Sequence, residues 1–448
     1  MTFSAREAAW EILERFERRT PGRRHQTLKL DACLERVFSS AKSASWRSED
    51  RRFCTALTYG VLRRWLPYEA RLQALSQFPW SRVAPPVRAL LRLGLFQLLD
   101  GDEIPPYAAL NETVEQARRR GLSKASIAFV NGMLRAVQRQ QAAGDWIPPS
   151  FEAEPSAHLA QVWNVPEWLG ARWLLHYGKS ETLAMARMLA DPPPLSLRVN
   201  TLQTSPKDLK TLLMSAGVTC AVLEDDPPEC LTLSGFYGSP VALPGFAEGA
   251  FFVQDRNAAR VSRFLAPEPG ETVVDLCAAP GGKTTHLAAL MANRGVLWAV
   301  ESVAAKMARL QENATRLGVT ILQTACEDAL TFSLPDGGRA DRVLIDAPCS
   351  GLGTIRRHPD ILLQLTERDL AQYADKQRAL LVHGLSLLRA GGEAVYATCS
   401  LDVTENGDVA RAVLKDCPNV CLLEERQWPI SSMGDGFYMA RFRLEQVQ

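Results

Sequence analysis

Residues Thr272–Ala288 constrain the fold more than any other stretch, because within them the pattern changes from strand to turn to helix. The run Val273–Leu276 is short, apolar and β-branched, which is typical of a buried parallel strand. The Pro280-Gly-Gly282 segment then breaks the chain, and apolar residues recur at helical spacing from Lys283 onward. A strand, a glycine turn and a helix in that order place a ligand at the carboxyl end of the strand.

Three classes of ligand compete for such a turn. Gly282-Lys-Thr284 matches the end of a phosphate-binding G-x-x-x-x-G-K-[ST] loop, but Cys277 occupies the position of its first glycine. The G-x-G-x-x-G pattern of dinucleotide-binding proteins is absent. A nucleoside-type cofactor such as S-adenosylmethionine needs an acid for its ribose, and Glu301 follows the next apolar run, Val296–Val300. An ordinary glycine turn, with Glu301 as a solvated strand end, remains as the alternative.

From Ala250 onward, short apolar runs alternate regularly with helical patterns. This alternation predicts an α/β domain with a doubly wound, Rossmann-like, mostly parallel sheet. Helices fill the gaps, notably at Glu367–Leu388 and Gly407–Leu414. The strand candidates are Val273–Leu276, Val296–Val300, Ile321–Thr324, Val343–Ile345, Ala394–Ala397, Val420–Leu423 and Phe437–Phe442.

Charge is distributed unevenly along the chain. The formal net charge is only +1, but residues 1–140 hold 24 Lys and Arg against 14 Asp and Glu, whereas the rest holds 27 against 36. A basic half joined to an acidic half indicates that the first half meets a polyanion. The alternative is an arginine-rich helical surface without a ligand, and charge alone does not decide between the two.

Residues 1–140 have the periodicity of an all-α domain. The most apolar helix, Val87–Leu99, begins after Pro85-Pro86, and we expect it at the centre of a bundle. The Arg118-Arg-Arg120 run lies just before Gly121, near a helix end where cations are stabilised. Helix capping and contact with a polyanion are therefore both open for that run.

This basic half resembles the NusB family of helical RNA-binding domains. The resemblance is diffuse but extends over almost all of residues 1–140, and it implies an RNA-binding role for them. The segments that carry it are Arg52–Arg63, Arg88–Leu98, Asn111–Ala117 and Phe129–Arg135.

Residues 141–156 are polar and contain prolines, so we interpret them as a linker. Residues 157–245 follow as a small α+β module that we expect to bind RNA, and residues 246–448 form the α/β domain. In the first strand of the module, Arg198 and Asn200 alternate with apolar residues, so we expect both to point out of the sheet toward solvent or RNA. A βαβ core is expected from Ser196–Asn200, Pro206–Ala216, Thr219–Leu223 and Cys230–Leu233.

Two cysteines follow strands of the expected α/β sheet. Cys349 lies in Asp346–Gly353, directly after one strand, and Cys399 lies in Ala397–Ser400, at the end of another. Because the carboxyl ends of parallel strands meet at one edge, both thiols should lie in the same row as the glycine turn. An isolated cysteine is ordinarily a buried structural residue. Two of them, each at a strand end and each followed by serine, disfavour that interpretation.

The motifs Cys277–Thr284, Asp346–Gly351 and Thr398–Ser400 together resemble the S-adenosylmethionine-dependent RNA cytosine-5 methyltransferases. With a NusB-like half in front, the chain is similar to members that act on RNA of the small ribosomal subunit. The resemblance covers nearly the whole chain and implies S-adenosylmethionine as the cofactor. The residues that it assigns to the cofactor are Cys277, Ala278, Ala279, Pro280, Gly281, Gly282, Lys283, Glu301 for the ribose, Asp328 for the adenine, and Asp346.

Carbon 5 of cytosine is a poor nucleophile, but a thiolate that adds to carbon 6 makes carbon 5 reactive toward a sulfonium methyl group. By resemblance Cys399 is this nucleophile, and Cys349 helps to remove the carbon 5 proton and release the enzyme. Asp346 would hold the cytosine edge and, if protonated, donate to N3. The opposite assignment makes Cys349 the nucleophile, as in the Pro-Cys of DNA cytosine methyltransferases. Two roles remain open for Lys283: it contacts the base or a phosphate, or it is an ordinary lysine at the start of a helix.

The resemblance therefore implies methylation of carbon 5 of a specific cytidine in 16S rRNA, in its free or early-assembly form, through a covalent cysteine adduct. The same chemistry on tRNA, and a non-catalytic RNA-binding ribosome assembly factor, are the alternatives. The target base must leave its stack to reach a pocket, so single-stranded or looped RNA, or a base flipped out of a duplex, is the expected substrate.

The composition excludes several classes of protein. No apolar run reaches transmembrane length, since Arg88 and Arg92 interrupt the longest, and the N-terminus lacks the shape of a signal peptide. The ten cysteines contain no C-x-x-C pair, which argues against a disulfide framework and against a metal site. We therefore expect a cytoplasmic protein with free thiols, no membrane or metal partner, and no obligate protein partner.

Overall fold

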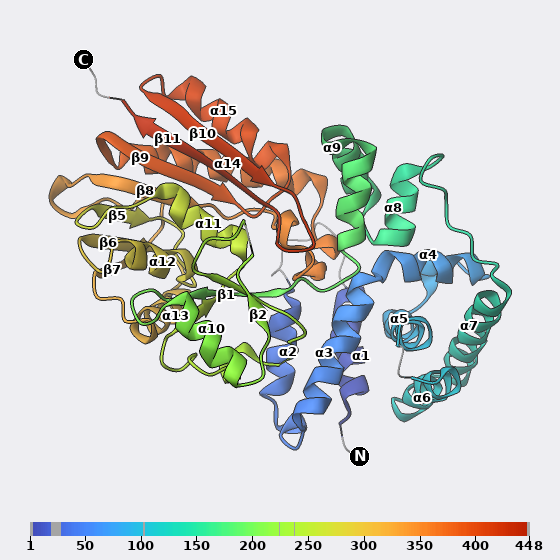
Figure 1. The fold of residues 1–448 in the computed structure, drawn as a ribbon. Helices are drawn as coiled ribbons and strands as arrows, with labels where there is room; N and C mark the ends of the chain where they lie inside the picture. Colours follow the sequence, from blue (N-terminus) through green and yellow to red (C-terminus); the bar gives the residue numbers. More distant parts are fainter. Residues whose placement is uncertain (1–2, 19–27, 102–103, 224, 237, 446–448) are drawn as a thin grey trace. The chain divides into compact units, whose positions relative to one another are not determined.

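The computed structural model describes residues 3–18, 28–101, 104–223, 225–236 and 238–445 (Figure 1). The chain divides into two compact units. The first comprises Met1–Pro192 together with Ile355–Glu367, and the second comprises Pro193–Thr354 and Arg368–Gln448. In the described part of the chain, no helix is both long enough and apolar enough to span a membrane.

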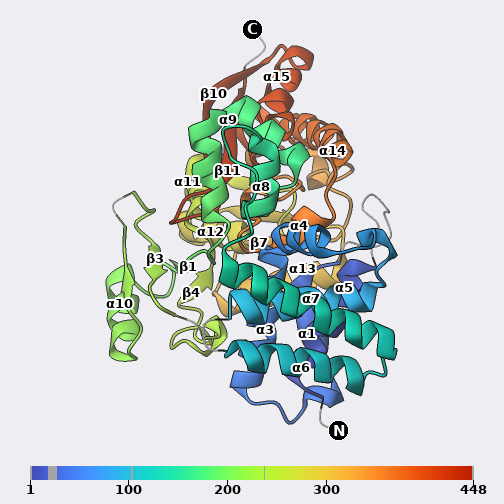
Figure 2. The same ribbon diagram turned by 90° about the vertical axis from the view of Figure 1, so that its right-hand side faces the viewer.

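The described residues of the first unit are helical, as periodicity predicted for residues 1–140, and the unit also includes α8 and α9, which were expected in the linker and the α+β module. Helix α5 packs against α1, α3, α4, α6 and α7, so the most apolar helix lies at the centre of the bundle. Helices α6 and α7 lie side by side (Figures 1 and 2). The helices are α1 (Ala5–Glu17), α2 (Leu30–Phe38), α3 (Ser48–Arg63), α4 (Trp65–Leu75), α5 (Pro85–Leu99), α6 (Pro106–Arg119), α7 (Lys124–Ala143), α8 (Pro155–Trp163) and α9 (Glu167–Met188).

The segment Ile355–Glu367 belongs to this helical unit although it lies between two strands of the α/β domain in sequence. The side-chain amide of Gln364 accepts a hydrogen bond from the Leu28 backbone N at 2.8 Å and donates one to the Leu28 carbonyl at 2.7 Å. Arg63 donates to the Arg356 carbonyl at 3.0 Å. The segment Ile355–Glu367 is therefore anchored on helices of its own unit.

The second unit contains a small sheet of four strands in the order β2-β3-β1-β4, in which neighbouring strands are antiparallel. Helix α10 (Pro206–Ser215) joins β1 to β2. Those two strands point the same way, but β3 lies between them, so the expected βαβ core exists in a split form. The strands are β1 (Leu195–Val199), β2 (Cys220–Ala221), β3 (Cys230–Leu233) and β4 (Phe251–Val253).

The larger sheet has seven strands in the order β10-β11-β9-β8-β5-β6-β7. Strands β9, β8, β5, β6 and β7 are parallel, whereas β11 and β10 add an antiparallel edge. All of the expected strands are present, and β8 and β9 begin earlier than expected. They are β5 (Thr272–Asp275), β6 (Val296–Val300), β7 (Leu322–Ala325), β8 (Ala340–Asp346), β9 (Leu388–Thr398), β10 (Val420–Trp428) and β11 (Phe437–Leu444).

Helices cover both faces of this sheet, because successive strand residues point to opposite sides. Val273 packs in one core with α11 (Arg256–Leu265) and α12 (Gly282–Leu290). Its neighbour Val274 packs in another core with α14 (Glu367–Ser386) and α15 (Gly407–Asp416). Helix α13 (Ala304–Arg316) packs against β6 and β7. The doubly wound architecture is confirmed.

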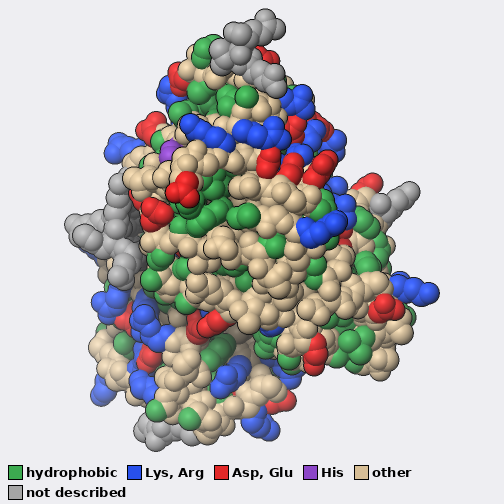
Figure 3. Space-filling model, turned by 90° about the vertical axis from the view of Figure 1, so that its left-hand side faces the viewer, with side chains coloured by type: hydrophobic (Ala, Val, Ile, Leu, Met, Phe, Trp, Pro, Cys, Tyr) green, Lys and Arg blue, Asp and Glu red, His purple; other side chains and the backbone are tan. Residues whose placement is uncertain are grey.

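Surface charges on the second unit are largely paired. Glu393 on β9 lies 3.2 Å from Arg342 and 2.6 Å from Arg443, and Asp341 lies 2.5 Å from Arg389. On the face drawn in Figure 3, Lys and Arg side chains are interspersed with Asp and Glu side chains. Ion pairs of this kind neutralise these carboxylates locally.

The expectation that Arg198 and Asn200 point to solvent or RNA is wrong. Both side chains are buried. Arg198 donates to the Gly282 carbonyl and to the Thr285 hydroxyl, each at 2.9 Å. Asn200 donates to the Gly249 and Leu317 carbonyls, each at 2.8 Å. Alternation predicted which face these residues share, but that face of the small sheet is covered by the larger domain, where Arg198 holds the start of α12.

Candidate active site

The turn between β5 and α12 is compact. Gly281, the N-cap residue of α12, has a φ of 99°, a left-handed conformation that favours glycine. A Cβ on Gly281 would lie 3.3 Å from Leu310 Cγ, and one on Gly282 would lie 3.0 Å from Phe252 Cε1. The Ala278 N–H donates to the Val300 carbonyl at 3.1 Å and so fixes the turn beside β6. The two glycines therefore let Leu310 and Phe252 pack closely against this turn.

Glu301 directly follows β6, beside this turn. Its side chain is 9% exposed, and its Oε1 accepts a hydrogen bond from the Val303 N–H at 2.9 Å. Burial is the largest cause of the raised pKa of the Cys277 thiol, and the charges of Asp275, Asp346 and Glu301 add to it in that order. The Glu301 carboxylate is thus held in position and acts electrostatically on Cys277 in the turn between β5 and α12.

Asp328 lies beyond the end of β7 and is exposed. Its Oδ1 accepts a hydrogen bond from the Leu330 N–H at 3.0 Å, which closes a local turn. A contact of this carboxylate with an adenine ring stays a prediction.

The two cysteines lie together. The Sγ atoms of Cys349 and Cys399 are 3.3 Å apart, and both side chains are partly exposed. The Gly353 N–H donates to the Cys399 carbonyl at 2.8 Å, and the Ala347 N–H donates to the Ala397 carbonyl at 3.0 Å. These bonds tie the loop after β8 to the loop after β9. The fold brings two thiols that are 50 residues apart in sequence into one partly exposed site.

The two thiols differ electrostatically. The pKa of Cys349 is raised well above its ordinary value, first by its hydrogen bond to Cys399, then by burial, the charge of Cys399 and the charge of Glu405. Either sulfur could be the donor of this hydrogen bond. A thiolate rather than a thiol is the nucleophilic form of cysteine. The raised pKa of Cys349 disfavours the thiolate form of that cysteine.

Lys283 connects the cofactor turn with these loops. Its Nζ lies 2.7 Å from Oδ2 of Asp346, the last residue of β8. Burial lowers the pKa of Lys283, but Asp346, and to a smaller extent Cys399, raise it to a net value above the ordinary one. Lys283 thus carries a positive charge that acts on both Asp346 and Cys399. The sequence left its role open, since a lysine at a helix start has no local signature.

A fully buried acid, Asp275, lies beneath the turn between β5 and α12. Asp275 ends β5, is fully buried, and accepts a hydrogen bond from the Thr284 hydroxyl at 2.8 Å. Burial raises the pKa of Asp275 to about 7; the Thr284 hydrogen bond opposes the shift and the Asp346 charge adds to it.

Replacing Asp275 by Asn is expected to stabilise the protein at alkaline pH. The folded protein retains the Asp275 proton up to about pH 7, whereas the unfolded chain loses it near a pKa of about 4. Between these pH values the folded state binds more protons than the unfolded state. The free energy of unfolding therefore falls by up to about 1.4 kcal/mol for each unit by which the pH rises. Thermal unfolding of both proteins at about pH 5 and about pH 8 would measure this. An equal difference at both pH values would contradict the prediction.

Sequence reasoning missed Glu405, which is completely buried beneath the two cysteine loops. It accepts hydrogen bonds from the Ser350 N–H at 2.8 Å and the Ser400 hydroxyl at 2.5 Å. The available signal was the serine after each cysteine, which indicated a shared partner without identifying it.

The helical unit carries a separate candidate feature. The Arg118-Arg-Arg120 run, left open between capping and polyanion contact, forms ion pairs with acidic residues of the same unit. Arg118 lies 3.1 Å from Glu115, Arg119 lies 3.2 Å from Glu112, and Arg120 pairs with Glu11. Much of the positive charge of this run is therefore neutralised locally.

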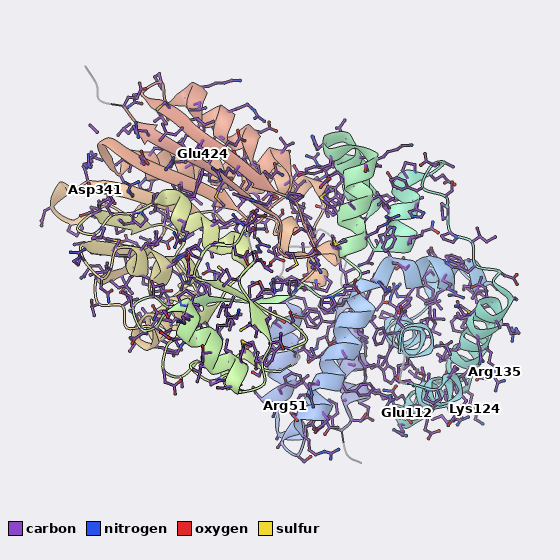
Figure 4. The ribbon with its side chains drawn as sticks, in the orientation of Figure 1. Arg51, Glu112, Lys124, Arg135, Asp341 and Glu424 are labelled. Carbon is purple, nitrogen blue, oxygen red and sulfur yellow. The ribbon has the colours of Figure 1, made fainter. Side chains whose placement is uncertain are left out.

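Beside that run is a hollow of about 940 Å³ between α6 and α7. Lys124, Arg135 and Glu112 lie close to one another along it (Figure 4). Arg6 and Arg118 also line the hollow, and Arg135 hydrogen-bonds Asn131 at 3.3 Å. Cations outnumber carboxylates in this lining, so the hollow has the charge that favours an anion.

Family models match three parts of the chain. A model described as 16S rRNA methyltransferase RsmB/F matches residues 262–443. The NusB family model matches residues 4–139, and a model of the ferredoxin-like domain of RsmF/B-like methyltransferases matches residues 165–238. The last match agrees with the split βαβ topology of the small sheet.

Individual relatives resemble the chain over most of its length. A probable ribosomal RNA small subunit methyltransferase B of Synechocystis is 36% identical over 414 residues, covering 92% of this chain and 89% of the relative. The corresponding protein of Bacillus subtilis is 35% identical over 389 residues, covering 85% and 83%. The crystal structure of PH0851 superposes with a TM-score of 0.77 at 26% identity, covering 99% and 98%.

Proposed function

The chain belongs to the 16S rRNA methyltransferase RsmB/F family, and from this premise we propose that it methylates carbon 5 of a cytidine in 16S rRNA through a transient bond to Cys399. At the coarser level it is an S-adenosylmethionine-dependent rRNA methyltransferase. The observation that carries the finer proposal is the pair of thiols 3.3 Å apart at the carboxyl ends of β8 and β9.

The residues of the turn fit S-adenosylmethionine. Gly281 and Gly282 form a tight turn at the carboxyl end of β5, the place where a nucleoside binds in such sheets, and Glu301 offers a fixed carboxylate suited to ribose hydroxyls. Cys277–Gly282 and Glu301 would hold the cofactor, with Asp328 on its adenine side. When bound, the cofactor supplies an electrophilic methyl group.

Cys399 is the nucleophile in this proposal. Its sulfur lies 3.3 Å from the Cys349 sulfur and interacts electrostatically with the Lys283 ammonium, which would stabilise the thiolate that attacks the base. Attack on carbon 6 of cytosine forms a carbon–sulfur bond and moves electron density onto carbon 5, which then becomes nucleophilic.

Asp346 and Lys283 would hold the pyrimidine edge. Asp346 already accepts a hydrogen bond from Lys283 at 2.7 Å, so it is an acceptor suited to the cytosine amino group. The ammonium of Lys283 is then the donor available to the ring as negative charge develops there. The alternative, in which a protonated Asp346 donates to N3, stays a prediction.

Cys349 would complete the reaction. The largest cause of its raised pKa is its interaction with Cys399. Once Cys399 is bonded to carbon 6 it carries no charge, so that cause is lost and the Cys349 thiol can release its proton to water. The resulting thiolate takes the proton from carbon 5, the carbon–sulfur bond breaks, and the aromatic ring is restored.

A methyl-transfer assay with a tritiated cofactor on free 16S rRNA, assembled small subunits and tRNA tests this function. We expect label in free 16S rRNA, and a bisulfite-resistant cytidine at one position of RNA from cells with the protein but not from cells lacking it. Label in tRNA alone would identify the alternative substrate. Label in a base other than cytosine would contradict the proposal, and no label in any RNA would favour a non-catalytic assembly factor.

The hollow on the helical unit is expected to contact the RNA backbone. Replacing Arg135 by Glu should weaken RNA binding several-fold. The slope of the logarithm of the affinity against the logarithm of the salt concentration should fall in magnitude by about one, the amount expected for one lost phosphate contact. The rate of methyl transfer at saturating RNA should change little. Filter binding over a range of salt concentrations would measure both the affinity and the slope. Arg51→Glu, a matched charge reversal on α3 of the same unit and outside the hollow, is the control. An equal loss in both variants would show that the hollow has no special role.

A further inference from the structure

Glu405 lies at the junction of the two cysteine loops. Its side chain is fully buried, and its two carboxylate oxygens receive four hydrogen bonds. Three of them come from the residues that directly follow the cysteines: the Ser350 N–H at 2.8 Å, the Ser350 hydroxyl, and the Ser400 hydroxyl at 2.5 Å. The fourth comes from the Gln377 side chain at 3.0 Å.

The backbone that carries Glu405 is itself fixed to β9. The Tyr396 hydroxyl donates to the Glu405 carbonyl. The next residue, Asn406, accepts from the Thr398 hydroxyl at 2.6 Å and donates to the Ser400 carbonyl at 3.1 Å. Glu405 is therefore a rigid acceptor rather than a side chain that follows the loops as they move.

A single acceptor shared by two loops controls the distance between them. Each cysteine is one residue away from a serine that Glu405 holds, and the Ser350 and Ser400 hydroxyls are themselves 3.1 Å apart. If the carboxylate were lost, buried donors on both loops would lack a partner, and each loop could turn toward a different one. The spacing of the thiols follows from this geometry.

We propose that Glu405 is a positioning residue that sets the separation and relative orientation of Cys349 and Cys399 by holding Ser350 and Ser400 on one carboxylate. The catalytic consequence rests on the proposed function, whereas the effect on the thiols does not. The charge of Glu405 also acts on Cys349, whose other titratable neighbours are Cys399 and Tyr396.

Glu405→Gln is the first test, because it preserves size while removing the charge and one acceptor. We expect kcat to fall by about 10- to 100-fold, as for a small misplacement of reacting groups, with the KM for RNA and cofactor nearly unchanged. Glu425→Gln on β10, where the wild-type carboxylate accepts from the Tyr438 hydroxyl at 2.9 Å, is the matched control and should retain full activity.

Thiol reactivity provides a readout that does not depend on methyl transfer. Iodoacetamide labelling followed by peptide mass spectrometry would give separate rates for Cys349 and Cys399, with the exposed Cys326 as an internal reference. In Glu405→Gln, Cys349 should become reactive at a lower pH, because a nearby negative charge is gone. The rate at Cys326 should not change.

Ser350→Ala and Ser400→Ala keep the test decisive if Glu405→Gln does not fold. Each should reduce kcat and alter the ratio of the two labelling rates, and the double variant should lose less than the sum of the two losses. If a folded Glu405→Gln leaves kcat and labelling unchanged, or if kcat falls while labelling at both cysteines stays as in the wild type, the proposal is overturned. Altered labelling in a protein whose wild type methylates no RNA would support the positioning role and reject the proposed function.

Discussion

Cys399→Ala is expected to abolish methyl transfer, with a rate reduction on the order of 10⁴-fold or more, as for loss of a covalent nucleophile. Without the sulfur at position 399 no bond to carbon 6 forms, and carbon 5 of cytosine remains too weakly nucleophilic to accept a methyl group. The Lys283–Asp346 ion pair is not lost with this sulfur, so the base edge should still be held. The measurement is single-turnover incorporation of tritium into 16S rRNA.

Cofactor binding separates this loss from a general defect. Cys399 is not part of the glycine turn, so the Kd for S-adenosylmethionine from calorimetry should stay close to that of the wild type. Cys326→Ala removes an exposed thiol from the same unit and should leave the rate unchanged. Substantial methylation by Cys399→Ala would remove the basis of the proposed mechanism.

Cys349→Ala is expected to accumulate a covalent RNA–protein adduct. Attack by Cys399 does not need the Cys349 side chain as a nucleophile, so the carbon–sulfur bond still forms. Removal of the carbon 5 proton does need a base, and without it the bond to carbon 6 persists. A radiolabelled RNA band shifted by the mass of the protein on a denaturing gel would detect this adduct, while steady-state turnover falls to background.

The double variant Cys349→Ala/Cys399→Ala is the matched control and should form no adduct. The single variants test which cysteine is the nucleophile and which is the base. An adduct in Cys399→Ala, with none in Cys349→Ala, would make Cys349 the nucleophile. The contact between the two Sγ atoms is compatible with either order, but the raised pKa of Cys349 favours Cys399.

Much of the α/β domain could be predicted from local patterns. The apolar run at Val273–Leu276, the glycine turn and the following helix are each specified by residues within a few positions of one another. The position of Cys349 and Cys399 at carboxyl ends of strands followed from the same reasoning, because parallel strands end at one edge. The structure confirms that both cysteines follow the carboxyl ends of parallel strands, and it shows that their sulfurs are 3.3 Å apart.

Other features depend on partners that are distant in sequence. Alternation correctly predicted that Arg198 and Asn200 share a face, yet whether that face meets water or protein depends on what packs against it. Lys283 and Asp346 are 63 residues apart, and only the folded sheet makes them an ion pair. Glu405 carries no motif of its own, because its role exists only where two separate loops converge.

The sequence by itself determined the order of strands and helices, the glycine turn, and which residue types lie at the active edge, because short-range sterics and hydrophobic periodicity act between neighbours along the chain. Only the tertiary structure decided how close the two thiols lie, where the Lys283 charge acts, and that one buried carboxylate holds both cysteine loops. Those properties arise from distances and desolvation between groups that the chain brings together only on folding.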